Sequence, residues 1–384
     1  MTSVDRIRQA FRGRLAGDPL LVASPGRINL IGEHTDYNDG FVLPAAIDKT
    51  IVFALAPRRD KKCRFVAVDL DDSFEASIDH LAPSPKHWPN YLVGVVDQLQ
   101  RRGYEIAGFD CAFGGDVPIG SGLSSSAAVE AGLAFALNEA FKLGIEKLDL
   151  VRIARAAEND FVGVQCGIMD QFANIFGKAK KVVQLDCRSL EYAYVPFERT
   201  DVRIVLCDTR IKRDLAASEY NIRRNQCEAG VLRLQKDNPQ IRSLRDVSRT
   251  LLEDHEKLLE PVIYRRCKYV VAENDRVVQA SESLRRGDIA SLGKLMNASH
   301  RGLRDEYQVS CAELDALADI AISLRGVFGA RMMGGGFGGC TINLVEDDAM
   351  GDFERDIRSL YRQKVQKDIK VSSCSISNGT SLVN

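Results

Sequence analysis

The sequence lacks the features that mark several large classes of protein. No uninterrupted apolar stretch approaches the ~20 residues that a membrane-spanning helix needs. Residues 1–15 carry charges throughout and have no apolar core of the kind found in signal peptides. Lys+Arg 52 and Asp+Glu 53 leave a net charge of -1, so no strong field attracts nucleic acid or a membrane surface. We therefore expect a cytoplasmic protein that binds neither.

Three further patterns are missing. No two of the ten cysteines are spaced C-x-x-C, so we expect reduced thiols rather than a zinc site or a disulfide framework. The glycine-rich segment at 120–126 is not a Walker A motif, because G-x-x-x-x-G-K-[ST] does not occur. It also lacks the third glycine of a protein-kinase loop. These absences argue against the P-loop NTPases and the protein kinases.

The length of 384 residues exceeds what one hydrophobic core usually supports, so we expect two domains, 1–195 and 196–384. Strand-like and helix-like segments alternate irregularly, which predicts an α+β fold. The expected strands are 50–58, 63–70, 181–187, 202–208 and 341–345. The expected helices are 88–103, 149–163 and 352–365, with helical character throughout 214–325. The C-terminal tail is expected to pack back on the first domain.

The segment GSGLSSSAAVE (120–130) concentrates glycine and serine where a long helix begins. One apolar stripe is expected along this helix, with Gly144 as its end, from Val129, Leu133, Leu137 and Phe141. Helix N-termini attract anions because their backbone N–H groups are unpaired. The alternative is an ordinary N-cap, for which one serine is enough. Four serines and two glycines favour phosphate binding.

Four acidic residues also need an explanation. Glu158 borders the apolar stripe of the helix expected at 149–163, so its carboxylate needs a partner, either an arginine from another element or a metal ion. Asp170 falls in the first turn of a further helix, where the dipole alone favours an acidic residue. Glu33, with His34 and Asp36, crowds polar groups between apolar segments. Turn chemistry at 38–40 does not account for these three residues.

Several of these segments resemble the GHMP small-molecule kinases. PIGSGLSSSAA (118–128) is similar to the phosphate loop of that family, and GGGFGGC (334–340) to its glycine-rich motif. SPGRINLIGEHTDYNDGFVLPAAID (24–48) is similar to the signature of the galactokinase branch. CGIMDQ (166–171) and SEYNIRR (218–224) also fit. The motifs stand in the family's order and cover most of the chain.

The resemblance implies both fold and activity. It implies a two-domain GHMP kinase fold with the active site in the cleft between the domains. The sugar signature and phosphate loop lie in the first domain, and the glycine-rich motif lies in the second. It implies transfer of phosphate from ATP to the anomeric hydroxyl of α-D-galactose. The product is α-D-galactose 1-phosphate, and the step is the first committed one of galactose catabolism. The implied cofactor is Mg²⁺ with ATP as co-substrate, and we expect a monomer.

The resemblance also implies roles for individual residues. Asp170 would be the catalytic carboxylate facing the C1 hydroxyl, and Arg27 would stabilise charge on the transferring phosphoryl group. Galactose would be bound by Arg27, Glu33, His34, Thr35, Asp36, Gly167, Asp170 and Tyr220. ATP would be bound by Gly120, Ser121, Gly122, Leu123, Ser124, Ser125 and Ser126. Mg²⁺ would be held by Ser126 and Glu158, a small protein ligand set of the kind it commonly takes.

Alternatives remain open. GGGFGG (334–339) contains G-x-G-x-x-G, which is also found in dinucleotide-binding proteins, but here the glycines lead into a strand rather than a helix. A related kinase for N-acetylgalactosamine or L-arabinose would carry similar motifs, and so would a sensor that binds galactose and ATP without turnover. Tyr220 could equally be an ordinary packed aromatic side chain.

Overall fold

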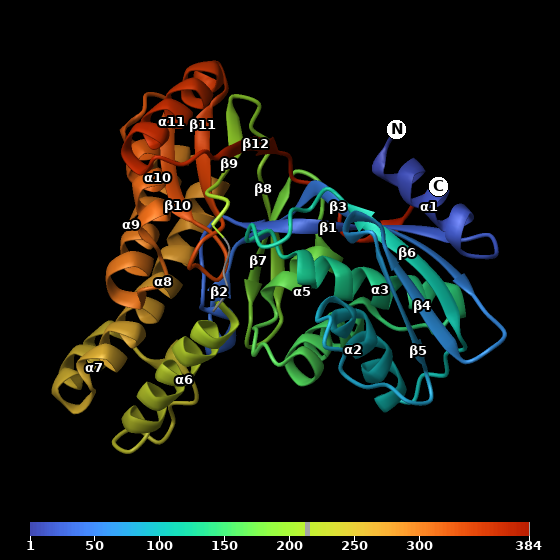
Figure 1. Ribbon diagram of the computed structural model, residues 1–384. Coiled ribbons are helices and arrows are strands. Elements are labelled where there is room, and N and C mark those ends of the chain that lie inside the picture. Colours follow the sequence, from blue (N-terminus) through green and yellow to red (C-terminus); the bar gives the residue numbers. More distant parts are fainter. Residues whose placement is uncertain (212–215, 384) are drawn as a thin grey trace.

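A computed structural model describes residues 1–211 and 216–383 of the chain. Within these residues the strands form three sheets, and helices gather around the two larger ones (Figure 1). The expected α+β class is confirmed. None of the described helices is long and apolar enough to cross a membrane.

The first sheet has six strands in the order β13-β1-β3-β6-β4-β5. Its strands are β1 (Leu20–Asn29), β3 (Pro44–Pro57), β4 (Lys62–Ala67), β5 (Asp72–Ser77), β6 (Phe109–Gly115) and β13 (Ser381–Leu382). Neighbours are antiparallel except β4 and β6, which are parallel. The pairing of β1 with β3 is irregular between Pro25 and Arg27. Such irregularities re-aim side chains next to functional sites.

Helices cover both faces of this sheet. On one face α3 (Ser125–Phe141) and α5 (Met169–Phe176) lie against β1 and β3, and α2 (Trp88–Arg101) and α4 (Lys147–Ala156) pack on α3. On the other face lies α1 (Ser3–Arg14), whose Ile7 and Phe11 are wholly buried against the sheet. The central strands β1, β3 and β6 are therefore mostly buried on both sides.

The second sheet has four antiparallel strands in the order β10-β11-β9-β12. Its strands are β9 (Val202–Asp208), β10 (Val327–Met332), β11 (Cys340–Glu346) and β12 (Lys370–Cys374). Three helices pack against it, namely α9 (Ile289–Arg301), α10 (Ala312–Ser323) and α11 (Met350–Val365). Figure 1 shows three more helices below them: α6 (Ala216–Leu234), α7 (Arg249–Asp254) and α8 (Pro261–Arg285).

The third sheet is small and lies between the other two (Figure 1). It has the order β2-β7-β8, from β2 (Phe41–Val42), β7 (Lys181–Asp186) and β8 (Tyr192–Pro196). β8 ends shortly before β9 opens the second sheet at Val202, while a domain division near residue 195 stays a prediction. After β12 the chain returns to the first sheet, where Ile376 bridges Ile47 and β13 pairs with β1.

Helix α3 differs from its expectation in two ways. It ends at Phe141, and Lys142 caps it in the left-handed conformation, so Gly144 lies outside the helix. Its buried residues are also spread around the helix rather than along one stripe, and Val129 and Phe141 are only partly buried. The physical reason is that α3 is covered by the first sheet and by three neighbouring helices, which leaves it no broad solvent face.

Candidate active site

A pocket of about 270 Å³ lies where segments from both halves of the chain meet. Its wall comes from β1 and the turn after it, α2, the loop before α3, the π-helical turn η3 (Ala157–Val162) and the loop after it, the start of α5, the start of α6 and the loop after β10. The residues that line it are Arg27, Glu33, His34, Asp36, Tyr91, Gly120, Gly122, Ser124, Ser125, Ser126, Glu158, Val164, Cys166, Gly167, Met169, Asp170, Tyr220, Gly334 and Gly335. Most site residues named from the sequence are thus brought together.

Three of the named residues do not line the pocket. The Thr35 side chain is buried and its hydroxyl donates to the carbonyls of Gly32 and Phe41, which stabilises the turn. Ser121 is turned back to donate to a carbonyl of its own loop. Leu123 is packed in the hydrophobic core.

The loop from Gly120 to Ser126 ends at the first turn of α3. Gly120 and Gly122 have φ of 75° and 84°, a region that glycine enters without strain. Ser124 occupies the N-cap position, but its hydroxyl makes no capping hydrogen bond. It donates instead to Asp170. The capping interpretation of this serine is therefore wrong, and the N-terminal N–H groups of α3 have no cap from it.

Arg27 and Asp170 form a two-pronged ion pair in the middle of the pocket. Nε of Arg27 lies 2.7 Å from Oδ1 of Asp170, and Nη2 lies 2.9 Å from Oδ2. The remaining Nη1 donates to the carbonyl of Gly122 in the phosphate loop. The Arg27 side chain is buried while that of Asp170 keeps 28% of its exposure, so the carboxylate is oriented by its partner and still open to the pocket.

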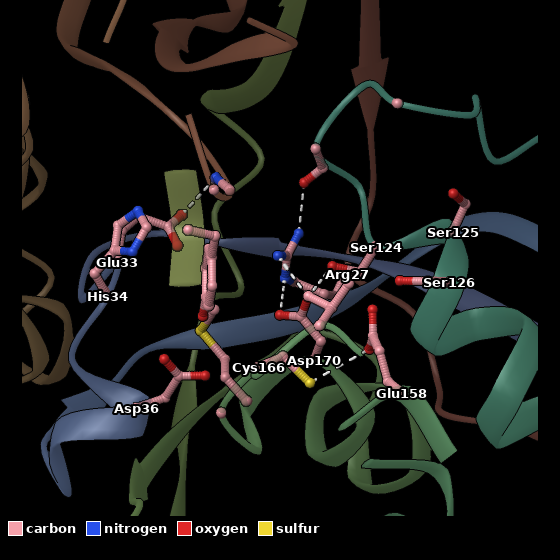
Figure 2. Close-up of a pocket in the computed structure, with 18 of the residues that line it drawn as sticks. Arg27, Glu33, His34, Asp36, Ser124, Ser125, Ser126, Glu158, Cys166 and Asp170 are labelled. Atoms are coloured by element: carbon pink, nitrogen blue, oxygen red, sulfur yellow. Dashed lines mark hydrogen bonds and ion pairs between the residues drawn. The ribbon is translucent and has the colours of Figure 1, made fainter. Parts of the chain in front are cut away.

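The sugar-signature residues lie on one side of this pair and the serine-rich loop with Glu158 on the other (Figure 2). His34 is held by Tyr37, whose hydroxyl lies 2.8 Å from Nδ1. Burial lowers the pKa of His34 to about 3, so the ring is neutral at physiological pH. Burial, together with the nearby Asp170 charge, raises the pKa of Asp36 to about 6.

Gly167 and Tyr220 complete this side of the pocket. A Cβ atom on Gly167 would lie 2.0 Å from the Asp36 carboxylate, so only glycine fits beside that group. The Tyr220 ring centroid lies 5.2 Å from those of His34 and Tyr37, and Tyr220 also faces the pocket. It is therefore both a packed aromatic and a lining residue.

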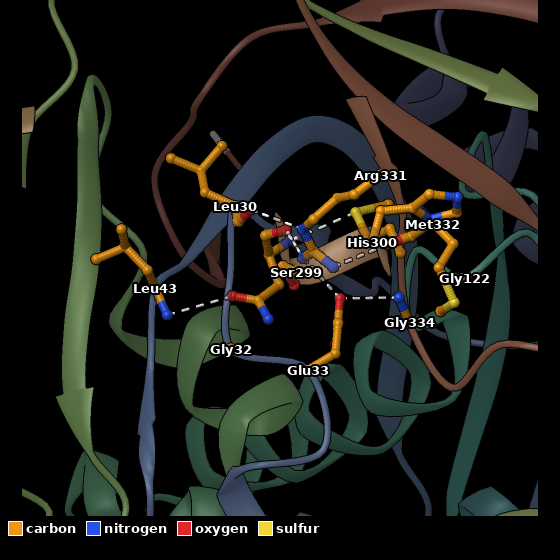
Figure 3. Close-up of polar contacts among 12 residues, drawn as sticks. Leu30, Gly32, Glu33, Leu43, Gly122, Ser299, His300, Arg331, Met332 and Gly334 are labelled. Atoms are coloured by element: carbon orange, nitrogen blue, oxygen red, sulfur yellow. Dashed lines mark hydrogen bonds and ion pairs between the residues drawn. The ribbon is translucent and has the colours of Figure 1, made fainter. Parts of the chain in front are cut away.

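Glu33 is anchored by a residue that the sequence analysis missed. Arg331, in β10, is wholly buried and its Nη2 lies 3.0 Å from Oε1 of Glu33. The backbone N–H of Gly334 donates to the same oxygen at 2.9 Å (Figure 3). Arg331 also donates to the carbonyls of Asn29 and Leu30 at the end of β1. β10 and the glycine-rich loop thus fix the Glu33 carboxylate.

Glu158 lies in the π-helical turn η3, where the widened backbone places its carboxylate among polar groups. It accepts from the Gln171 amide at 2.8 Å and from the Cys166 thiol at 3.4 Å, and the nearby Ser126 hydroxyl favours its charged form. Burial raises the pKa of Glu158, and the Asp170 charge adds to the shift. Its recorded contacts within the described residues include no ion pair, so the arginine salt bridge considered from the sequence is not formed.

Glu130 is a second missed residue. It is wholly buried in α3, next to Glu158 and Gln171, and its Oε1 has no hydrogen-bond partner among the described residues. Burial, followed by the Glu158 charge, raises the pKa of Glu130 well above its ordinary value. A signal was present, because Glu130 is a single acidic residue within an otherwise small and apolar helical run.

The glycine-rich motif has a structural role that separates it from dinucleotide-binding loops. Gly334 to Gly339 join β10 to β11, two antiparallel neighbours in one sheet. A Cβ on Gly336 would meet the carbonyl of Val309 at 2.0 Å, so the loop is closely packed. The strand-loop-strand context contradicts a dinucleotide-binding βαβ unit.

Comparison with known proteins identifies the class first. The model of the GHMP kinases N terminal domain matches residues 90–178, and that of the GHMP kinases C terminal matches residues 280–363. The galactokinase galactose-binding signature matches residues 9–57. A mevalonate kinase from Methanococcus jannaschii shares the fold with a TM-score of 0.65 at 17% identity, covering 94% of this chain and 99% of that one. Fold and motifs define a GHMP kinase.

Relatives of higher sequence identity then identify the branch of the GHMP kinases to which the chain belongs. A galactokinase from Roseiflexus sp. is 44% identical, covering 100% of this chain and 98% of its own. One from Clostridium acetobutylicum is 42% identical over 94% of both chains. The crystal structure of Lactococcus lactis galactokinase complexed with galactose matches with a TM-score of 0.96 and 36% identity, covering 100% of both chains. The chain belongs to the galactokinase family.

Proposed function

We propose that the protein is a galactokinase that transfers the terminal phosphoryl group of ATP to the C1 hydroxyl of α-D-galactose. The observation that carries the proposal is the place of the Arg27–Asp170 pair. It lies between the residues of the sugar signature and the loop at the N-terminus of α3 (Figure 2). A sugar on one side and a nucleotide phosphate on the other would meet at Asp170. The resemblance of the chain to a galactokinase solved with galactose supports the choice of sugar.

The sugar side offers fixed groups for hydroxyl recognition. Glu33 is held by Arg331 and Gly334, so its carboxylate has one orientation. Asp36 adds a second carboxylate and neutral His34 adds a ring nitrogen. Carboxylates accept from two hydroxyls at once, and preorganised acceptors lower the cost of binding. Each of these groups is buried or partly buried, which shields its hydrogen bonds from water.

The phosphate side is formed by the open N-terminus of α3, a 17-residue helix. Its dipole and unpaired N–H groups favour the phosphates of ATP. Ser126 and Glu158 fit a Mg²⁺ ion, because their hydroxyl and carboxylate line the same part of the pocket and the buried carboxylate has no ion pair among the described residues. When bound, Mg²⁺ would neutralise charge on the phosphate oxygens.

The catalytic step follows from the Arg27–Asp170 pair between the two sides of the pocket. Asp170 would accept a hydrogen bond from the C1 hydroxyl, orient its oxygen toward the phosphorus atom, and take the proton as the new bond forms. Arg27 would stabilise the negative charge on the transferring phosphoryl group while keeping Asp170 in place. Its donation to the carbonyl of Gly122 ties this arrangement to the phosphate loop.

We also propose a cytoplasmic monomer. All ten cysteines are free thiols, as expected in a reducing compartment. Size-exclusion chromatography with light scattering would test the monomer. A second species at twice the chain mass of 42.5 kDa would contradict it.

The activity is tested by following the phosphorus directly. Protein, galactose and Mg-ATP are mixed, and ³¹P NMR is recorded until ATP is consumed. We expect ADP and one sugar phosphate whose ³¹P–¹H coupling places the phosphate on C1 in the α configuration. Phosphate at another carbon would contradict the assigned roles. No turnover, with galactose and nucleotide still raising the melting temperature, would identify a sensor instead.

A further inference from the structure

A chain of buried hydrogen bonds leads from the pocket into the C-terminal half of the protein. It begins at Nδ1 of His34, which lies 2.8 Å from the hydroxyl of Tyr37. That hydroxyl lies 2.7 Å from the hydroxyl of Tyr307, which in turn lies 3.2 Å from Sγ of Cys227. Of these four groups only His34 lines the pocket. Tyr307, at the end of the π-helical turn η6 (Gly302–Tyr307), is wholly buried.

The number of protons in this chain is fixed at neutral pH. Burial lowers the pKa of His34 to about 3, so its ring carries one N–H. Burial raises the pKa of Tyr37 and of Tyr307 well above 10, and that of Cys227 to about 11, so each keeps its proton. The three hydrogen bonds then either all point toward the histidine or all point away from it, because a mixed arrangement would leave the hydrogen of one tyrosine hydroxyl without an acceptor.

The backbone carbonyl of Gly335 favours the direction toward the histidine. It attracts a ring proton of His34, because its hydrogen bond raises the pKa of the ring against the larger effect of burial. Tyr37 occupies Nδ1, so this proton is on Nε2, and Cys227 is the donor at the far end of the chain. Tyr307 then donates to Tyr37, and Tyr37 donates to Nδ1 of His34. The ring proton is therefore on Nε2, which is buried and, among the described residues, has the Gly335 carbonyl near it but no partner in good hydrogen-bond geometry.

We infer that Tyr307, acting through Tyr37, is a positioning residue that holds the His34 proton on Nε2, so that this nitrogen donates a hydrogen bond to a hydroxyl oxygen of the bound sugar. The inference rests on the proposed function, because it assigns a sugar to the pocket. The site would then hold one fixed donor beside the fixed acceptors Glu33 and Asp36. Such a site would select sugars by the orientation of a hydroxyl group as well as by its position on the ring.

Packing makes the inference testable by a change of one atom. The Tyr307 ring lies 4.9 Å from the His34 ring and 4.8 Å from the Tyr269 ring, centroid to centroid. Tyr307→Phe keeps these contacts and removes only the hydroxyl. Tyr361→Phe is the matched control, because Tyr361 is also wholly buried, lies in the separate α11 core, and has a hydroxyl with no partner among the described residues.

The first measurement is ¹⁵N NMR of the imidazole rings in the ligand-free protein, with the His34 signals assigned from a His34→Asn variant. We expect the Nε2–H tautomer in the wild type and in Tyr361→Phe, and a mixture of tautomers in Tyr307→Phe. A wild-type Nδ1–H tautomer, or a Tyr307→Phe spectrum identical to wild type, would overturn the inference. Because no sugar is present, this result does not depend on the proposed substrate.

The second measurement is steady-state kinetics with galactose and Mg-ATP. Loss of one oriented hydrogen bond should raise the KM for galactose roughly threefold to tenfold in Tyr307→Phe, with kcat and the KM for ATP close to wild type. Equal changes in both KM values would overturn the positioning role. If Tyr307→Phe does not fold by circular dichroism, Tyr37→Phe tests the same chain one bond nearer the histidine. A wild type inactive on galactose would refute the function and leave the tautomer result standing.

Discussion

Arg331 and Glu33 lie 298 residues apart in the chain and form a buried ion pair in which Nη2 is 3.0 Å from Oε1. The exposed fractions of the two side chains are 0% and 2%. The pair joins β10, in the second sheet, to the turn that follows β1, in the first. The carboxylate proposed to recognise the sugar is thus placed by a residue from the other half of the molecule.

The first prediction concerns the stability of this pair. Arg331→Met should lower the free energy of unfolding by about 3–5 kcal/mol, because it leaves the Glu33 carboxylate buried without its counter-charge. Urea denaturation followed by circular dichroism measures the change. Arg355→Met, at a surface ion pair whose arginine is 65% exposed, is the control and should change stability by less than about 1 kcal/mol.

A double variant separates the lost charge balance from lost packing. Arg331→Met combined with Glu33→Gln should be more stable than Arg331→Met alone, because the uncompensated charge is gone. Glu33→Gln by itself should weaken galactose binding more than ATP binding in calorimetric titrations. An Arg331→Met protein as stable as wild type would contradict the structural role of the pair.

The second prediction concerns Asp170. Asp170→Asn should lower kcat about 10²-fold to 10⁴-fold, the range expected for loss of a group that accepts the reacting proton. Galactose binding should be largely kept, because the amide has nearly the same shape. Rapid-quench turnover and calorimetric binding measure the two effects. Asp149→Asn, on the far exposed end of α4, is the control. Near-normal turnover in Asp170→Asn would reject the catalytic role.

The third prediction concerns Glu158 and metal. Glu158→Gln should raise the Mg²⁺ concentration needed for half-maximal activity and weaken the dependence of ATP binding on Mg²⁺. The folded state should be kept, because burial already opposes the charged form of this carboxyl group and the amide is neutral. Calorimetric ATP titrations with and without Mg²⁺ give a readout independent of turnover. Unchanged metal dependence in both assays would show that Glu158 has a purely structural role.

The fourth prediction uses the pKa of Asp36, which burial raises to about 6. A carboxyl group in an unfolded chain titrates near 3.9, so folding must work against the ionised form once the pH exceeds that value. The contribution of Asp36 to stability is therefore favourable below about pH 4 and is lost as the pH rises through about 6. Asp36→Asn should raise the melting temperature relative to wild type at pH 8 and much less at pH 4.

The same titration should appear in sugar binding. If the ionised Asp36 accepts a sugar hydroxyl, galactose affinity in the wild type falls as the pH drops below about 6, and the fall is absent in Asp36→Asn. Asp39→Asn, the neighbouring and more exposed carboxylate, serves as the control. An affinity that is flat from pH 5 to pH 8 in the wild type would contradict a role for the Asp36 charge.

The sequence was informative where function requires an unusual local composition. Glycine and serine crowd the entry of α3 beyond what a helix cap needs, and Glu158 stands beside an apolar stripe where a charge is costly. Both features are visible without a structure. Glu158 and most of these glycines and serines line the pocket. Asp170 could be placed in the first turn of α5 from the helical pattern, and the structure shows its pairing with Arg27.

Other features depend on contacts that local patterns do not contain. Neighbouring residues of a motif share a segment, but their side chains point in different directions. The Thr35 and Ser121 hydroxyls therefore donate to backbone carbonyls and do not face the pocket. Arg331 lies just before the glycine-rich motif, and nothing in the surrounding sequence indicates that its partner is Glu33. The stripe expected on α3 failed because its neighbours cover it on nearly all sides, which only the tertiary arrangement determines.

The most direct test of the account is ATP consumption with Mg²⁺ against a panel of acceptors. The panel contains galactose, N-acetylgalactosamine, L-arabinose, glucose, mevalonate and homoserine, each at the same concentration, with ADP release as the readout. The account predicts that kcat/KM for galactose stands well above that for every other compound. A higher kcat/KM for N-acetylgalactosamine or L-arabinose, or no ADP release with any of the six, would contradict it.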